Sequence, residues 1–158
     1  MRNRGICTLT LIKELEREGY SVNLYLFEMS DCGRQRVFSQ WNLKKPGQPM
    51  DYRSLYFPMV NPSFLRRLSF RLREITPELT STWVGGYGST CGLGTVKSYL
   101  QTSPTAIVVN QPDDHGIKGR DIEEDYKQFV RSVSRDLDKA KKFFDEKERT
   151  PADDGGRK

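Results

Sequence analysis

Apolar positions recur at helical spacing near both ends of the chain. The N-terminal repeat, from Ile6 to Leu15, predicts an amphipathic helix that stops at Gly19, since glycine commonly follows a helix C-terminus. The C-terminal repeat predicts a helix over residues 121–146, and a shorter helix is expected over residues 95–100. These patterns place helices at both ends of the chain, with strands expected between them.

Segments rich in aromatic and β-branched residues predict the strands. Residues 21–28 are apolar on both faces of an extended chain, which is typical of a central strand. Residues 37–43 predict a second strand, and residues 55–57 predict a short edge strand that ends before Pro58. Residues 106–110 are the best candidate for a parallel strand. This order predicts an α/β fold with three layers, in which helices flank a mostly parallel central sheet. Because such domains usually begin with a strand, we expect either that the first strand is absent or that the natural chain begins earlier.

The segment from Asn61 to Thr76 has the clearest amphipathic pattern. Asn61 is a good N-cap, Pro62 fits the first turn, and Pro77 disfavours a helical residue before it. We expect one continuous helix here. Its apolar stripe, which we expect to be buried, is Phe64, Leu65, Leu68, Leu72 and Ile75. Its opposite face, which we expect to bind an acidic protein surface or nucleic acid, is Arg66, Arg67, Arg71 and Arg73.

Length and charge narrow the class of protein. A chain of 158 residues is expected to form one domain, over residues 1–149, followed by a disordered polar tail over residues 150–158. The net charge of +5 favours an anionic partner. Three widely spaced cysteines predict neither a disulfide framework nor a zinc site, so we expect a reducing, cytoplasmic compartment. No apolar run approaches the roughly 20 residues that span a bilayer, so no membrane contact is expected.

A glycine-rich segment precedes the short helix predicted at residues 95–100. Its backbone amides could cradle a phosphate group, and the candidate binding residues are Gly85, Gly86 and Gly88. The segment lacks the Gly-Lys-Ser/Thr ending of a P-loop and the spacing of a dinucleotide fingerprint. A flexible surface loop is the favoured interpretation, and phosphate binding is the alternative.

Asp113, Asp114 and His115 follow the strand predicted at residues 106–110. If that strand is parallel, they lie at the carboxyl edge of the sheet, where two carboxylates and an imidazole could hold a divalent metal. The composition of residues 111–116 favours a solvated turn instead. A nucleophile formed by Cys91 with His115 is disfavoured, because nothing in the sequence brings the two residues together.

Two segments resemble a known family. The run from Arg4 and Gly5 through Leu15-Glu16-Arg17-Glu18-Gly19-Tyr20 to Val22-Asn23-Leu24 resembles a helix–strand unit of von Willebrand factor A-like domains. Residues 61–70, with Glu74, are similar to a segment of poorly characterised phage and bacterial proteins of that general topology. The resemblance covers residues 4–110 and implies a Rossmann-like topology and a phage or prophage origin. The metal-binding aspartate–serine motif of such domains would lie on the first strand, which this chain lacks.

Three functions follow as expectations. The leading one is a non-enzymatic, cytoplasmic, phage- or mobile-element-related protein that engages a macromolecular partner through its basic helix face, with no cofactor. The alternative is a nucleotide- or nucleic-acid-binding protein that uses the arginines and the glycine-rich segment. The third is a metal-dependent hydrolase built on Asp113, Asp114 and His115.

Overall fold

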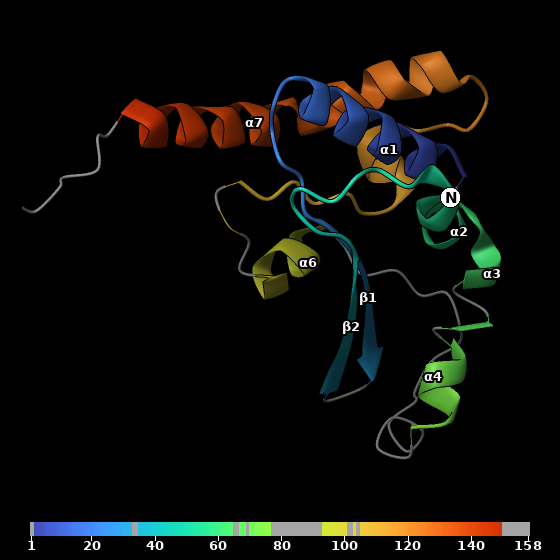
Figure 1. The fold of residues 1–158 in the computed structure, drawn as a ribbon. Helices are drawn as coiled ribbons and strands as arrows, with labels where there is room; N and C mark the ends of the chain where they lie inside the picture. The colour runs from blue at the N-terminus through green and yellow to red at the C-terminus, as the bar shows by residue number, and fades with distance from the viewer. Residues whose placement is uncertain are drawn as a thin grey trace, which may run out of the picture.

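The computed structural model describes residues 2–32, 35–64, 67–68, 70–76, 93–100, 103 and 105–149. Its elements are α1 (Arg2–Arg17), β1 (Leu24–Cys32), β2 (Gln35–Lys44), α2 (Tyr52–Val60), α3 (Pro62–Phe64), α4 (Phe70–Glu74), α6 (Leu93–Leu100), the 3-10 helix η2 (Pro112–His115) and α7 (Ile122–Arg149). In Figure 1, α1 and α7 lie together at the top, while the β1–β2 hairpin and α4 extend below them.

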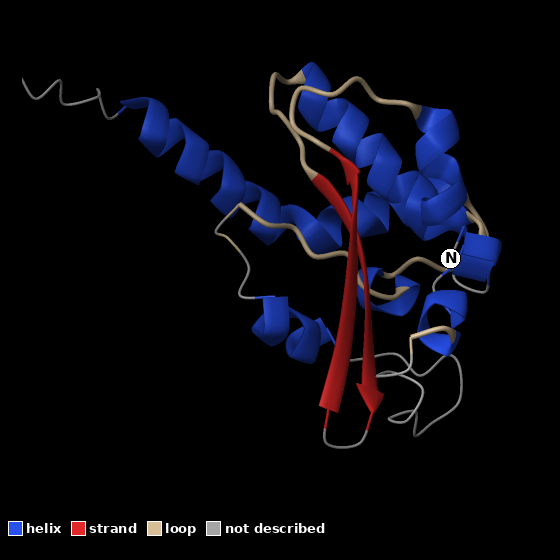
Figure 2. Cartoon of the chain, turned by 60° about the horizontal axis from the view of Figure 1, so that its bottom comes forward, coloured by secondary structure: helices blue, strands red, loops and turns tan. Residues whose placement is uncertain are grey.

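The sheet is a two-stranded antiparallel hairpin, in register from Leu24 opposite Lys44 to Cys32 opposite Gln35. Figure 2 shows the two strands lying side by side with helices to both sides of them, and the described chain contains no other strand. The predicted three-layer, mostly parallel α/β sheet is therefore wrong, and so is the von Willebrand factor A-like topology. Two residues separate the strands, so they pair locally without a crossover connection. Residues 106–110 are in neither a helix nor a strand.

The helices predicted near both ends are confirmed. α1 ends two residues before Gly19, whose φ of +94° lies in the left-handed region that favours glycine. α7 begins after Asp121, whose carboxylate accepts hydrogen bonds from the backbone N–H groups of Glu123 and Glu124. The predicted helix over residues 95–100 corresponds to α6.

The short strand predicted over residues 55–57 is wrong, because this stretch belongs to α2. The Asp51 carboxylate caps the helix by accepting from the backbone N–H of Arg53 at 3.0 Å. Leu55 and Val60 are buried, so α2 presents an apolar face to the core. Three apolar residues are too few to distinguish a strand from a helix turn.

Of the helix predicted over residues 61–76, the structure describes α3, residues 67–68 in a π-helical conformation, and α4, while residues 65, 66 and 69 lie outside the described residues. Asn61 caps α3 as predicted, with its side-chain oxygen accepting from the backbone N–H of Ser63 at 2.9 Å. Of the predicted apolar stripe, Phe64 is half-buried against the rings of Trp41 and Phe57, but burial is wrong for the other three members that the structure describes. Leu68, Leu72 and Ile75 are 53%, 44% and 59% exposed. Leu65 lies outside the described residues.

The largest core cluster joins the two long helices. Cys7 and Leu11 of α1 pack with Phe129, Val133 and Leu137 of α7. The helix predicted at the C-terminus therefore has a buried apolar face, although Ile122 at its start is exposed. Two smaller clusters connect α1 to β1 and α2, and β1 to α6 and the segment near residue 108.

Gly5 sets how closely α1 approaches α2. A Cβ atom at this position would lie 2.4 Å from the backbone oxygen of Met59 and 2.7 Å from a methyl group of Val60. A side chain of any size would therefore push the two helices apart.

Candidate functional site

The predicted basic face is exposed where the structure describes it. Arg67 and Arg71 are both exposed, and Arg71 pairs with Glu74 at 3.2 Å, one helical turn away. The structure shows no ion pair between Arg67 and another described residue. Arg66 lies outside the described residues, as does the side chain of Arg73. Two of the four predicted arginines can thus be placed at the surface.

Apolar side chains share this surface with the arginines. Leu68, Leu72 and Ile75 alternate along the chain with Arg67 and Arg71, and all five are exposed. Figure 1 places α4 below α2 and α3, away from α1 and α7. We call these five residues the 67–75 surface. It combines guanidinium groups with aliphatic side chains that water solvates poorly.

The predicted phosphate cradle cannot be located, because Gly85, Gly86 and Gly88 lie outside the described residues. Phosphate binding there stays a prediction. The polar tail predicted over residues 150–158 also lies outside them.

His115 is buried and makes two hydrogen bonds. Its Nε2 accepts from the backbone N–H of Asn110 at 3.0 Å, so Nε2 carries no proton. Nδ1 therefore carries the proton and donates to Ser132 Oγ at 2.8 Å, and that hydroxyl donates to the backbone oxygen of Phe129 at 2.7 Å. This network holds η2 against α7.

The same surroundings keep His115 neutral. Burial lowers the pKa of the imidazole, and the positive charges of Arg4 and Lys97 lower it further, whereas the Asp114 carboxylate opposes them. A neutral imidazole bonded at both nitrogens has a structural role in this arrangement.

Asp113 and Asp114 lie at the surface beside this histidine. Asp113 is exposed, and the Asp114 carboxylate accepts from the side-chain amide of Asn110 at 2.8 Å. In the part of the chain that is described, no three histidine, cysteine, aspartate or glutamate side chains are grouped so that they could hold a metal ion. The structure therefore adds no support to the predicted metal site.

A second buried polar residue, Asp125, was not anticipated from the sequence. Its carboxylate accepts from the Asn3 amide and from the backbone N–H groups of Lys118 and Gly119, each at 2.8 Å. Burial raises the pKa of this carboxyl group, but the hydrogen bonds outweigh burial and hold the pKa below its usual range. Burial and the charge of Asp125 raise the pKa of the neighbouring Cys7 thiol to about 11, so the thiol stays protonated and unreactive.

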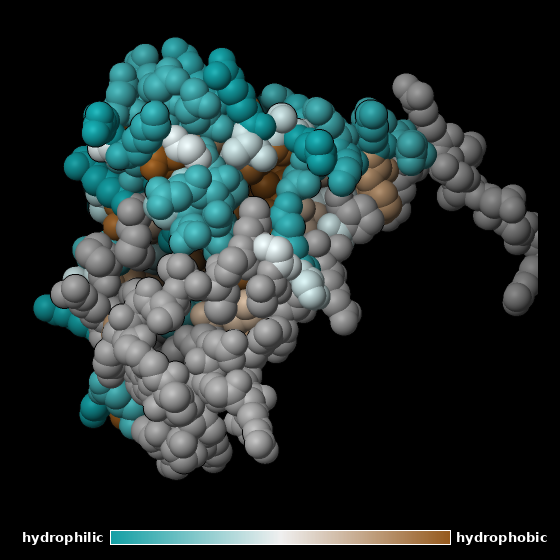
Figure 3. Space-filling model, turned by 180° about the vertical axis from the view of Figure 1, so that it is seen from behind, coloured by the Kyte–Doolittle hydropathy of each residue, from teal (hydrophilic) through white to brown (hydrophobic). Residues whose placement is uncertain are grey.

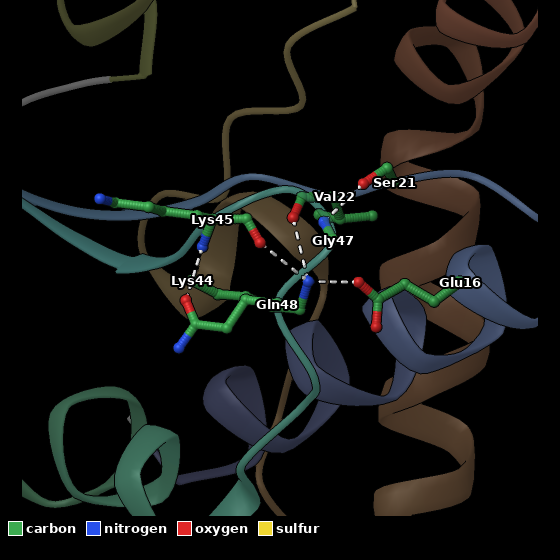
Figure 4. Close-up of polar contacts among 7 residues, drawn as sticks. All are labelled: Glu16, Ser21, Val22, Lys44, Lys45, Gly47 and Gln48. Atoms are coloured by element: carbon green, nitrogen blue, oxygen red, sulfur yellow. Dashed lines mark hydrogen bonds and ion pairs between the residues drawn. The ribbon is translucent and has the colours of Figure 1, made fainter.

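Lys44, at the end of β2, is only 1% exposed. Figure 4 shows its ammonium group directed towards the Glu16 carboxylate. Its ammonium pairs with Glu16 of α1 and donates to the backbone oxygens of Val22 and Lys45, both at 3.3 Å. Nearby, the backbone N–H of Gly47 donates to Ser21 Oγ at 2.9 Å. These contacts fasten the hairpin to α1. Nothing in the local pattern signals them, because they join residues far apart in sequence.

A cavity of about 610 Å³ lies between α1, the start of β1, residues 103 and 105–110, and α7. Leu11, Leu15 and Leu137 line its walls, and Arg4 lies at its surface. One Arg4 nitrogen donates to the backbone oxygen of Asn110 at 2.7 Å. Burial lowers the pKa of this guanidinium, and no described carboxylate pairs with it. Sequence reasoning missed this cavity, because its walls come from four separate segments.

Among the described residues, no helix combines the length and apolarity needed to cross a membrane. The fold and these contacts define a mainly helical protein built around one antiparallel hairpin. The chain belongs to a family described as a domain of unknown function (DUF7192), whose model matches residues 1–142. No curated protein and no solved structure matches the chain.

Proposed function

We propose that this chain is a non-enzymatic binding protein that engages an acidic protein surface through the 67–75 surface. The observation that supports the proposal is the exposure of Leu68, Leu72 and Ile75 beside Arg67 and Arg71. Burying these aliphatic side chains against a partner is favourable, at about 25 cal/mol per Å² of apolar area.

The mixture of side chains favours a protein partner over nucleic acid. Protein interfaces commonly combine an apolar centre with arginine, whereas phosphate backbones reward positive charge alone. Arg67, without an ion pair among the described residues, is available to a carboxylate. The exposed pair of Arg71 with Glu74 contributes little to stability, so a partner carboxylate can compete for Arg71.

Two other functions were expected from the sequence. The experiment described next tests the nucleic-acid alternative directly, by comparing binding of a peptide with binding of DNA. The metal-dependent hydrolase gains no support from the hydrogen-bonded, neutral His115. The phage or mobile-element association stays a prediction.

The test compares two fluorescent probes by anisotropy, at low and high salt. One probe is an amphipathic helical peptide rich in leucine and glutamate, and the other is single-stranded DNA. We expect the peptide to bind more tightly, and its affinity to fall as salt rises. Arg67→Glu should weaken peptide binding several-fold, since an exposed ion pair contributes about 0.2–1 kcal/mol and reversal adds repulsion.

Arg131→Glu on α7 is the matched control, because Arg131 is an exposed arginine outside the 67–75 surface. It has the same change in net charge and should leave affinity near that of the wild type. Equal weakening by both reversals would mean that only net charge matters. Preferred binding of DNA, unaffected by Leu72→Ser, would replace the proposal with the nucleic-acid alternative.

A further inference from the structure

The cavity borders two stretches of backbone. Every residue from Tyr20 to Phe27 lines it, as does every residue from Thr105 to Asn110. Successive side chains of an extended chain point to opposite faces, so a cavity over one face would be lined by alternate residues. The unbroken runs indicate that the backbone of both segments, as well as their side chains, borders the cavity.

The backbone of one of these segments lacks partners. Residues 107–109 make no hydrogen bond to any residue that the structure describes. The flanking groups are bonded, since the N–H of Ala106 donates to the Ser103 oxygen at 2.9 Å and that of Asn110 donates to His115. Val108 is only 6% exposed. Burying a backbone polar group without a hydrogen-bond partner is destabilising, so these groups favour any ligand that bonds to them.

The start of β1 offers a second unpaired edge. β2 occupies one edge of β1, and in the described chain no other strand joins the sheet. From Leu24 to Phe27, the edge of β1 that faces away from β2 therefore has no strand beside it among the described residues.

The chemistry of the walls limits what can occupy the cavity. Aliphatic side chains such as Leu11, Leu15 and Leu137 require an apolar occupant, whereas the two backbone edges require donors and acceptors in alternation. A fatty acid meets the first requirement but has no donor for the free carbonyl groups. An extended peptide meets both, and a strand of five or six residues, about 17–20 Å long, matches the Thr105–Asn110 run.

We propose that the cavity binds an extended, apolar peptide segment of a partner polypeptide by strand addition. Its backbone bonds to residues 107–109 and to the Leu24–Phe27 stretch of β1 on the side away from β2, and its C-terminal carboxylate pairs with Arg4. Strand addition is an established mode of peptide recognition, in which backbone bonds supply affinity and side-chain pockets supply specificity.

The test is calorimetric titration of the full chain with three probes. The first is an acetylated six-residue peptide of alternating valine and threonine with a free C-terminal carboxylate. The second is the same peptide N-methylated at alternate residues, which removes backbone donors while keeping its side chains. The third is dodecanoate. We expect the first peptide to bind at least about tenfold more tightly than the second, since N-methylation removes two or three hydrogen bonds to the protein.

A pair of variants locates the site. Ala140→Phe fills the cavity from α7 and should weaken peptide binding, whereas Lys139→Phe places the same side chain at an exposed neighbouring position and should not. Circular dichroism checks that both variants fold, and the probe comparison decides the question even if one does not. Equal binding of both peptides, tighter binding of dodecanoate, no binding at millimolar peptide, or unchanged affinity in folded Ala140→Phe would each overturn the proposal.

Discussion

The α1–α7 interface and the 67–75 surface carry similar amphipathic patterns with opposite outcomes. Phe129 and Cys7 are fully buried between α1 and α7, whereas Leu68 and Ile75 are more than half exposed. An apolar stripe predicts that a helix has a face to bury, but it does not say against what. In α1 and α7 the two stripes cover each other. On the 67–75 surface the apolar side chains stay in contact with water, which makes it the better candidate for a binding surface.

The largest expected effect comes from removing a core side chain. Phe129→Ala should lower the free energy of unfolding by about 3–5 kcal/mol, through lost burial and the cavity left behind. Leu68→Ala truncates a residue of the stripe predicted over residues 61–76, and it should change the free energy of unfolding by less than about 0.5 kcal/mol. Urea denaturation measures both changes. Similar losses would erase the distinction between the two regions.

Gly5→Ala tests how tightly α1 packs against α2. Alanine favours a helix by up to about 1 kcal/mol, but its Cβ would meet the Met59 backbone, so we expect a net loss of about 1–3 kcal/mol. Gly94→Ala in α6 is the control, because nothing lies within 4 Å of the added Cβ, and this change should be neutral or stabilising. A stabilised Gly5→Ala protein would mean that α1 and α2 are farther apart.

Glu16→Gln tests the attachment of the hairpin to α1. It leaves the buried Lys44 ammonium without its carboxylate, and we expect a loss of about 1–3 kcal/mol. Glu18→Gln is the matched change at the pair between Glu18 and Lys141, whose side chains are both exposed, and should cost less than about 0.5 kcal/mol. Thermal melts of the two variants at one pH compare these stability losses. An equal fall in melting temperature would contradict the predicted difference.

The pH dependence of stability reports on His115. Because the folded-state pKa lies below the unfolded value of about 6.5, the stabilisation is complete above that pH and is lost as pH falls towards the folded value. Unfolding free energies measured across this range should decline less in His115→Gln than in the wild type. Identical profiles would show that another group causes the decline.

The sequence predicted the elements that depend on local pattern. The caps at Asn61 and Gly19 and the long helices were predicted from neighbouring residues, and the structure agrees with them. The arrangement of the sheet was not predicted, because an apolar run such as residues 21–28 is compatible with either a central parallel strand or a hairpin. The buried polar contacts of Lys44 and Asp125 join distant segments, so no local pattern reveals them.

The most direct test of the account measures stability and binding together in the double variant Leu68→Ser, Leu72→Ser. Both side chains are exposed, so we predict that the unfolding free energy changes by no more than about 1 kcal/mol in total. Affinity for the leucine- and glutamate-rich peptide should fall several-fold in the same preparation. A large loss of stability with unchanged affinity would contradict the account, because the 67–75 surface would then belong to the core.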